Sequence, residues 1–482
     1  MELLKQKRLF RTQNYIDGQW VEADAGKKNS VINPADGKIL GQIPACGALE
    51  TRRAIEAAAA AFPLWRGWEA QRRATLMWRW AQLIDENKED LARLIVLEGG
   101  KPLAEARAEI DYANSFIKWF AEEGRRIYGD IIPSVVAKQH LLVIKQPIGV
   151  VAAITPWNFP AAMITRKCAP ALAAGCTVVV RPADKTPFTA FALAALAEEA
   201  GLPKGVLNVV TGAAEEMGLE LTSNPLVRKF SFTGSTAVGR QLMRQCASTI
   251  KKVSLELGGN APFLVFDDAD LEAAVRGVMA SKFRNMGQSC VCANRIYVQE
   301  SVYDAFTEKL VVAVKALQVG NGLEAGVQQG PLINEAGLKK VKEHVADALA
   351  KGAQLRCGGQ PHALGGLFFE PTVLTEATMD MRLAKEETFG PVAPLFRFRS
   401  EEEGVALANQ TEFGLGAYFY SRDIHRVWRV SEALECGMVG VNEGIFSNEV
   451  APFGGVKESG IGREGSKYGI EEYLEIKYLC MG

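Results

Sequence analysis

Cys290 ends the segment Asn-Met-Gly-Gln-Ser-Cys, in which small and turn-forming residues follow a stretch with helical periodicity. A cysteine in an exposed loop or at a helix edge can have a lowered pKa, and its thiolate is a strong nucleophile. The sequence therefore makes Cys290 a candidate nucleophile. Cys168, Cys176 and Cys246 lie in apolar or amphipathic segments, and we interpret them as buried and inert.

Cys292 forms a C-x-C pair with Cys290, but no metal site follows from it. The chain has four histidines without ligand spacing, namely His140, His344, His362 and His425. Zinc needs such ligands in close array, so we expect no metal. A Cys–His hydrolase stays open because catalytic partners can be distant in sequence, although no histidine lies in a suitable loop.

Two further polar residues follow strand-like segments. Glu256 lies in SLELGGN, before two glycines, where a carboxylate is well placed as a general base. Asn158 lies between two prolines in PWNFP, and a rigid amide suits an oxyanion donor. Taken alone, the SLELGGN motif favours a solvated or salt-bridged glutamate, and a structural turn is the alternative for PWNFP.

The segment Gly234-Ser-Thr-Ala-Val-Gly239 lies between an apolar strand and a helix. Glycine allows close approach of a ligand, and a helix N-terminus offers free N–H groups to a phosphate. The spacing differs from G-x-G-x-x-G, so an ordinary strand–helix turn is the alternative.

Alternating strands and helices must position these residues. The pattern is helical from Thr51 to about Tyr128, and from Leu141 strands alternate with helices. Such alternation predicts parallel βαβ units and a Rossmann-like sheet. A second alternating series begins near Lys252, which indicates a second α/β domain.

Two segments, around residues 131–146 and 471–482, have the pattern of extended strands with apolar faces. Unpaired strand edges invite association with another chain, so we expect a homo-oligomer, a dimer or a tetramer. The alternative is that both strands extend an internal sheet.

The composition is that of an ordinary globular protein. The 482 residues include 55 Lys plus Arg and 56 Asp plus Glu, and 48% of them are hydrophobic. The near-neutral net charge lacks the excess of basic residues that is typical of nucleic-acid-binding proteins. No apolar run reaches the roughly 18 residues of a membrane span. The N-terminus lacks the pattern of a signal peptide. Nine scattered cysteines indicate free thiols in a reducing compartment, so we expect a cytoplasmic protein, with a mitochondrial matrix location as the alternative.

Six motifs together give a resemblance that none of them carries alone. PWNFP, GSTAVG, LELGGN, GQSC, EETFGPV and PFGGVKESGIGRE occur in the order and at the separations of the aldehyde dehydrogenase superfamily. The segments AAMITRK, SKFRNMGQSCVCANR, SNEVAPFGG and EGSKYGIEEYLEIKY are most similar to the succinate-semialdehyde dehydrogenases.

The resemblance implies a fold and an activity. The fold is α/β, with a Rossmann-like cofactor domain (1–127 and 147–257), an α/β catalytic domain (258–458) and oligomerisation strands (128–146 and 470–482). The activity is NAD(P)-dependent oxidation of succinate semialdehyde, which belongs to γ-aminobutyrate catabolism. A glutarate semialdehyde dehydrogenase, a general aldehyde dehydrogenase and a cysteine-dependent acyl hydrolase stay open as alternatives.

The matched motifs also imply residue roles. Cys290 would attack the aldehyde, Glu256 would activate water for thioester hydrolysis, and Asn158 with the backbone N–H of Cys290 would hold the oxyanion. Cys292 resembles the partner of a redox switch that would form a disulfide with Cys290. Matched cofactor positions are Ile154, Trp157, Lys167, Phe232, Gly234, Ser235, Gly239, Glu387 and Phe389.

Cofactor choice and substrate choice rest on two further sets. At the adenosine ribose the chain has Arg181-Pro-Ala-Asp184-Lys185 where the family commonly has Lys-Pro-Ala-Glu or Lys-Pro-Ala-Ser. A carboxylate favours the ribose hydroxyls of NAD, which we favour, whereas the two cations attract the 2′-phosphate of NADP. Arg166, Arg284 and Ser447 match the positions that hold a distal carboxylate, a group suited to the planar arginine fork.

Overall fold

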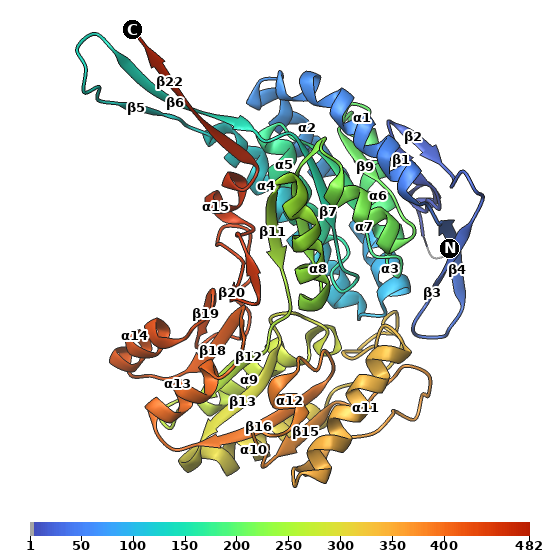
Figure 1. The fold of residues 1–482 in the computed structure, drawn as a ribbon. Coiled ribbons are helices and arrows are strands. Elements are labelled where there is room, and N and C mark those ends of the chain that lie inside the picture. The colour runs from blue at the N-terminus through green and yellow to red at the C-terminus, as the bar shows by residue number, and fades with distance from the viewer. Residues whose placement is uncertain (1–3) are drawn as a thin grey trace.

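The computed structural model describes residues 4–482, so the first three residues of the predicted segment 1–127 lie outside the described residues. Two large sheets, each covered by helices, form the body, and a third, three-stranded sheet projects from it as an arm (Figure 1). The chain is therefore α/β, as predicted.

The first sheet has the strand order β2-β1-β9-β8-β7-β10-β11-β21. Its strands are β1 (Asn14–Ile16), β2 (Gln19–Val21), β7 (Val150–Ile154), β8 (Thr177–Arg181), β9 (Leu207–Val209), β10 (Val227–Thr233), β11 (Lys252–Glu256) and β21 (Gly460–Ile461). The five strands from β9 to β11 run parallel to one another, which confirms the Rossmann-like prediction. Strands β7 and β8 are buried throughout, as expected for valine-rich central strands with helices on both faces.

Strand β11 corrects the prediction that a second series begins near Lys252. It pairs in parallel with β10, with Thr233 opposite Glu256, and so completes the parallel part of the first sheet. Alternation along the sequence shows that a strand forms but does not show which sheet it joins. As a consequence, Glu256 and the turn after β10 lie at the same sheet edge.

Eight helices cover the first sheet and its flank: α1 (Ala48–Arg66), α2 (Ala70–Glu86), α3 (Lys88–Gly99), α4 (Leu103–Glu123), α5 (Ala162–Ala174), α6 (Pro187–Glu199), α7 (Ala214–Ser223) and α8 (Thr236–Cys246). Every residue of α5 is buried, and α5 packs closely on α4. It ends at Gly175, whose φ of +99° is the left-handed conformation that glycine adopts readily.

The second sheet has the order β14-β15-β16-β13-β12-β18-β19. Its strands are β12 (Ala261–Val265), β13 (Ala293–Gln299), β14 (Gln354–Cys357), β15 (Thr372–Thr375), β16 (Val392–Phe398), β18 (Gly416–Tyr420) and β19 (Met438–Val441). Its helices are α9 (Leu271–Lys282), α10 (Tyr303–Lys315), α11 (Glu335–Ala350), α12 (Arg382–Lys385), α13 (Glu401–Asn409) and α14 (Ile424–Ala433). This sheet is the predicted second α/β unit.

The arm consists of β5 (Asp130–Ile132), β6 (His140–Pro147) and β22 (Leu474–Met481). Strand β22 pairs antiparallel with β6 over its whole length, and β5 pairs with the other edge of β6. The two predicted strand segments therefore pair with each other, and the alternative that they extend an internal sheet is wrong.

The remaining elements are short. They are β3 (Lys28–Ile32), β4 (Ile39–Pro44), β17 (Phe413–Gly414), β20 (Val456–Lys457), α15 (Ser466–Glu471) and the 3-10 turns η1 (Lys7–Leu9), η2 (Gly124–Arg126), η3 (Ala247–Thr249), η4 (Arg284–Gly287) and η5 (Glu300–Val302). Within residues 4–482, no helix has the length and apolar character needed to cross a membrane. The predicted domain boundaries stay a prediction.

Candidate active site

Two cavities meet at Cys290. The larger of these two, which we name the large cavity, has a volume of about 680 Å³. It is bordered by the turns after β7, β10 and β11, by the start of α11 and by residues 387–389. The small cavity, of about 170 Å³, lies between α4, α5 and the segment 445–453. Cys290 and Met163 line both cavities, so the Cys290 side chain can be reached from either cavity.

An unusual backbone turn directly precedes Cys290 in the chain. Asn285, Met286 and Gly287 all have positive φ, a conformation that costs free energy for the two residues with side chains. The Asn285 amide offsets this cost by donating to the carbonyl oxygens of Gln288 and Asn158, both at 3.1 Å. Cys290 lies in the predicted loop and is half-buried.

The pKa of Cys290 differs from the lowered value that an exposed loop suggests. Burial raises it to about 12, an effect that Arg166 partly offsets and the carboxylates Glu387 and Glu256 increase. The thiol is therefore neutral at rest and has to lose its proton as it attacks. Cys168, Cys176 and Cys246 are buried, as predicted.

Asn158 lines the large cavity beside Cys290. Its Nδ2 donates one hydrogen to the carbonyl of Gln288 at 3.1 Å, which leaves a second N–H. The backbone N–H of Cys290 has no hydrogen-bond partner within residues 4–482. These two free donors can serve a developing oxyanion. Lys101 fixes the Asn158 peptide by donating to its carbonyl at 2.8 Å, a contact that the sequence did not indicate.

Glu256 ends β11, is buried and lines neither of the two cavities. Its Oε2 has no hydrogen-bond partner within residues 4–482. Burial raises the pKa of Glu256 well above its ordinary value, and the like charge of Glu464 raises it further. A carboxylate with these properties holds a proton more tightly than an exposed glutamate does, which suits a general base.

Glu464 is a functional candidate that the sequence interpretation missed. It is buried, and its two oxygens lie 2.6 Å from Arg166 Nη2 and 2.5 Å from Lys167 Nζ. These two cations lower the pKa of the Glu464 carboxyl. The available signal was a glutamate in the glycine-rich segment GIGRE. Two cations on successive residues of α5 thus share one carboxylate next to Glu256.

The predicted anchors Arg166, Arg284 and Ser447 all line the small cavity together with Cys290. Their electrostatic states differ. Arg166 is buried, pairs with Glu464 and stacks on the ring of Phe453 at 3.9 Å. Arg284 has no carboxylate within ion-pair distance in the described chain, so its charge is open to a ligand.

Five of the predicted cofactor residues line the large cavity: Trp157, Gly234, Ser235, Glu387 and Phe389. Ser235 is the N-cap of α8, and the rings of Trp157 and Phe389 meet edge to face at 5.6 Å. Glu387 accepts the N–H of Gly259 at 3.3 Å, and burial raises its pKa to about 7.

The other predicted cofactor residues do not line this cavity. Ile154 and Phe232 are buried at strand ends, and Gly239 packs on Leu257, where a Cβ would approach to 2.4 Å. Lys167 is fully buried, and its Nζ forms an ion pair with Glu464, whose carboxylate neutralises the lysine charge. A buried ammonium has to be paired, which keeps Lys167 away from the cavity.

Arg181 and Asp184 form an ion pair at 2.7 Å near the large cavity. Asp184 and Lys185 line a neighbouring cavity of about 850 Å³, which shares Ile333 and Asn334 with the large one. The pair with Arg181 reduces the negative charge that Asp184 presents there.

Cys292 is buried, and its Sγ lies 3.5 Å from the Nζ of Lys282. It forms no disulfide in this structure, and the redox switch with Cys290 stays a prediction. Residues 4–482 contain no cluster of three or more His, Cys, Asp or Glu side chains suited to a metal.

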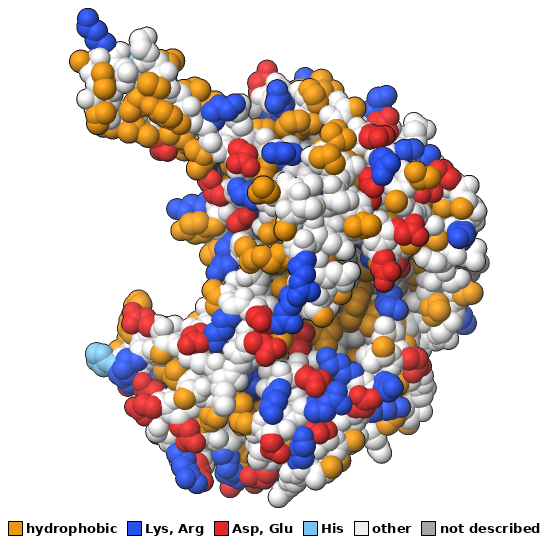
Figure 2. Space-filling view, viewed as in Figure 1, with side chains coloured by type: hydrophobic (Ala, Val, Ile, Leu, Met, Phe, Trp, Pro, Cys, Tyr) orange, Lys and Arg blue, Asp and Glu red, His pale blue; other side chains and the backbone are white. Residues whose placement is uncertain are grey.

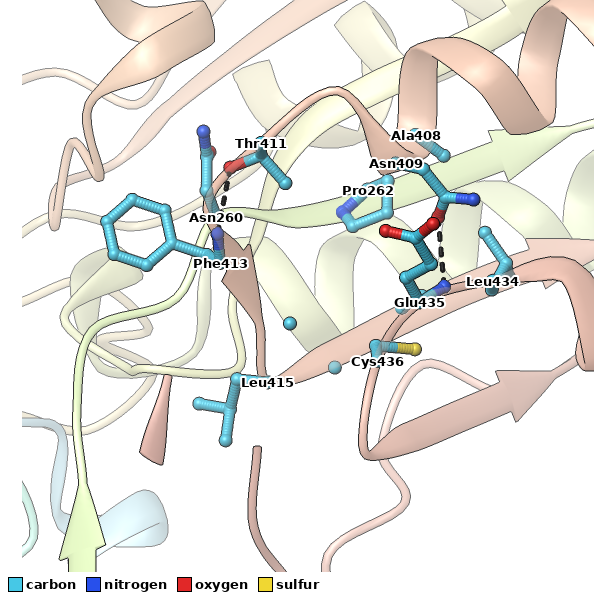
Figure 3. A pocket seen from close by; sticks show the side chains of 13 residues that line it. Asn260, Pro262, Ala408, Asn409, Thr411, Phe413, Leu415, Leu434, Glu435 and Cys436 are labelled. Atoms are coloured by element: carbon cyan, nitrogen blue, oxygen red, sulfur yellow. Dashed lines mark hydrogen bonds between the residues drawn. The ribbon is translucent and has the colours of Figure 1, made fainter. Parts of the chain in front are cut away.

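A further void lies beside Asn260, Pro262 and Glu435, where Asn409 accepts the Glu435 N–H at 2.9 Å (Figure 3). Its volume of about 10 Å³ holds no more than one water molecule, so it is not a ligand site.

Known proteins resemble this chain over its whole length. The sequence model described as "Aldehyde dehydrogenase family" matches residues 20–479. The glutarate-semialdehyde dehydrogenase of Pseudomonas aeruginosa is 64% identical over 479 residues, with 99% of each chain covered. The succinate-semialdehyde dehydrogenase [NADP(+)] GabD of Escherichia coli K12 is also 64% identical, with the same coverage. A crystal structure of an E. coli NADP dependent enzyme superposes with a TM-score of 0.99 at 64% identity, covering 99% of this chain and 100% of that one.

Proposed function

Because the chain belongs to the aldehyde dehydrogenase family, we propose that it oxidises succinate semialdehyde to succinate with NAD(P). The observation that supports this substrate assignment is the small cavity, which both the unpaired Arg284 and Cys290 line. An aldehyde with a distal carboxylate places its two ends against these two residues. Glutarate semialdehyde is the alternative substrate, since one methylene discriminates by only about 1–3 kcal/mol.

The chemistry begins at Cys290. Its sulfur attacks the aldehyde carbon while the thiol proton passes to solvent water, and a thiohemiacetal forms. The oxygen of the thiohemiacetal accepts hydrogen bonds from Asn158 Nδ2 and the Cys290 N–H. Stabilising that oxygen as an anion favours departure of hydride and leaves a thioester on Cys290. Glu256 then takes a proton from water, which hydrolyses the thioester and releases the acid.

The large cavity fits a nicotinamide dinucleotide. The N-terminus of α8 offers backbone N–H groups to a pyrophosphate, and Gly234 and Ser235 leave the approach open. Glu387 would bind the nicotinamide ribose, with Phe389 and Trp157 bordering the ring. When bound, this cofactor accepts the hydride.

We propose that both NAD and NADP are accepted. The preference for NAD rested on the negative charge of Asp184, but Arg181 neutralises that carboxylate at 2.7 Å. Lys185 lies next to it and adds a positive charge. The relative from E. coli K12 is named as NADP(+)-dependent, which agrees with this view.

Arg284→Ala is the test of the substrate. Loss of one partner of a charge pair removes about 2–5 kcal/mol, so kcat/KM for succinate semialdehyde should fall at least about 30-fold. The value for butanal, which has no distal charge, should change little. Steady-state assays with each aldehyde, and with NAD and NADP, measure both effects.

Arg284→Lys is the matched control, because it keeps the charge but loses the two-pronged donor. It should recover part of the lost kcat/KM. Equal losses for both aldehydes in Arg284→Ala would contradict the substrate assignment, and a wild type that prefers butanal would indicate a general aldehyde dehydrogenase. Ester hydrolysis without any NAD(P)-dependent oxidation would identify an acyl hydrolase instead.

Glu464→Gln should move the pH dependence of kcat. The carboxylate of Glu464 raises the pKa of Glu256, whereas Arg166 and Lys167 lower it. Glu256 accepts a proton only when ionised, so activity is lost as pH falls through its pKa. Without the Glu464 charge this pKa falls, and the acid limb should move down by about one pH unit. A limb that stays in place or moves up would refute this coupling.

We propose that the arm joins copies of the chain into a homo-oligomer, a dimer or a tetramer. Hydrophobic side chains gather on the arm (Figure 2), among them the exposed Ile131, Val135 and Ile476. Apolar surface of this kind is typical of an association site. The double variant Ile131→Asp/Ile476→Asp should reduce the mass measured by light scattering to that of a smaller assembly. Leu64→Asp, at an exposed leucine of the body, should not.

A further inference from the structure

His344 is a fully buried histidine on α11 that the mechanism above does not use. Its Nδ1 lies 3.2 Å from Thr388 Oγ1, and its Nε2 lies 3.2 Å from Glu386 Oε2. These two residues flank Glu387 in the chain. One side chain therefore contacts both neighbours of the residue assigned to the nicotinamide ribose.

A neutral imidazole satisfies both contacts. The Glu386 carboxylate only accepts hydrogen bonds, so Nε2 carries the proton and donates it. Nδ1 then accepts the hydrogen of the Thr388 hydroxyl. Burial lowers the pKa of His344, which agrees with this neutral form.

The segment that carries Glu387 depends on contacts from outside. It lies between α12 and β16, with no regular structure of its own, and Phe389 has a left-handed φ of +56°. Asn294 holds one side, accepting the Thr388 N–H at 3.3 Å and donating to the Glu386 carbonyl at 3.2 Å. His344 holds the other side through the side chains.

Helix α11 also borders the large cavity. Asn334, Gly337 and Lys340 line it, and Lys340 lies one turn before His344. The helix that forms part of the cavity wall thus also holds the Glu387 segment in place.

We propose that His344 is a positioning residue that fixes Glu387 for the cofactor, mainly through Thr388. This inference rests on the proposed function, in which the large cavity binds NAD(P). Thr388 is buried and lines that cavity, whereas Glu386 is exposed and keeps its bonds to Arg382 without His344.

Two isosteric variants separate the contacts. In His344→Asn the amide oxygen takes the place of Nδ1 and can accept from Thr388, and in His344→Gln the amide reaches the place of Nε2. We expect His344→Gln to weaken NAD(P)+ binding about tenfold, the loss of one buried hydrogen bond, and His344→Asn to stay near the wild type. Tryptophan fluorescence measures the binding, since Trp157 lines the cavity.

Hydrolysis of p-nitrophenyl acetate without cofactor, which in the proposed function uses the Cys290 nucleophile, should be unchanged in both variants. Lys342→Ala, on the exposed face of the same helix, should also bind NAD(P)+ like the wild type. Wild-type affinity in His344→Gln, or equal losses of affinity and ester hydrolysis in both variants, would overturn the inference. Failure of the wild type to bind NAD(P)+ would instead overturn the proposed function.

Discussion

Cys290→Ser should lose at least about 10⁴-fold in kcat for aldehyde oxidation, as expected when an enzyme loses its nucleophile. Serine keeps the shape of the side chain, but its hydroxyl is a far weaker acid than the thiol, even though burial raises the pKa of Cys290 to about 12. In the described chain no other cysteine lines the two cavities, so no second thiol can replace it. Formation of NAD(P)H from succinate semialdehyde measures the loss.

The matched control is Cys357→Ser. Cys357 is half-buried like Cys290 but lies on β14, at the edge strand of the second sheet. This variant should keep the wild-type rate, and both variants should keep wild-type NAD(P)+ affinity. Substantial oxidation by Cys290→Ser would show that the sulfur at the meeting point of the two cavities is not the nucleophile.

Glu256→Gln should separate the two halves of the reaction. The amide has nearly the same shape but cannot take a proton from water, so thioester hydrolysis should slow by about 10²–10⁴-fold. Attack by Cys290 and hydride transfer do not require this proton acceptor. Rapid mixing should therefore show a burst of about one NAD(P)H per active site, followed by slow turnover, and intact mass spectrometry should show an acyl group on the protein.

The Glu256 prediction has a matched control on the same strand. Lys252→Gln changes a charged residue at the start of β11, far from its carboxyl end, and should give steady turnover without an accumulated acyl group. Loss of the burst itself in Glu256→Gln would assign Glu256 to the deprotonation of Cys290 rather than to hydrolysis. An unchanged steady-state rate would remove Glu256 from the mechanism.

The sequence determined the local elements and the candidate chemistry. Valine-rich segments bounded by glycine and proline predicted β7 and β8, and the loop around Cys290 and the strand end at Glu256 were correct. These features depend on nearby residues, because hydrophobic periodicity and turn-forming residues act over short stretches of chain. The motifs added the family, which the match over residues 20–479 confirms.

Tertiary structure decided which strand joins which sheet and which charges meet. Strand β11 joined the first sheet, and β6 paired with β22 from the other end of the chain. Glu464 lies about 300 residues after Arg166 and Lys167, yet it neutralises both and raises the pKa of Glu256.

The physical reason is that burial and electrostatics depend on distance in space. Periodicity cannot show that Arg166 is already paired while Arg284 is free, nor that desolvation raises the pKa of Cys290. The sequence by itself thus pointed to the candidate reacting groups, and only the fold determined how their pKa values shift and which cation of the described chain has no carboxylate partner.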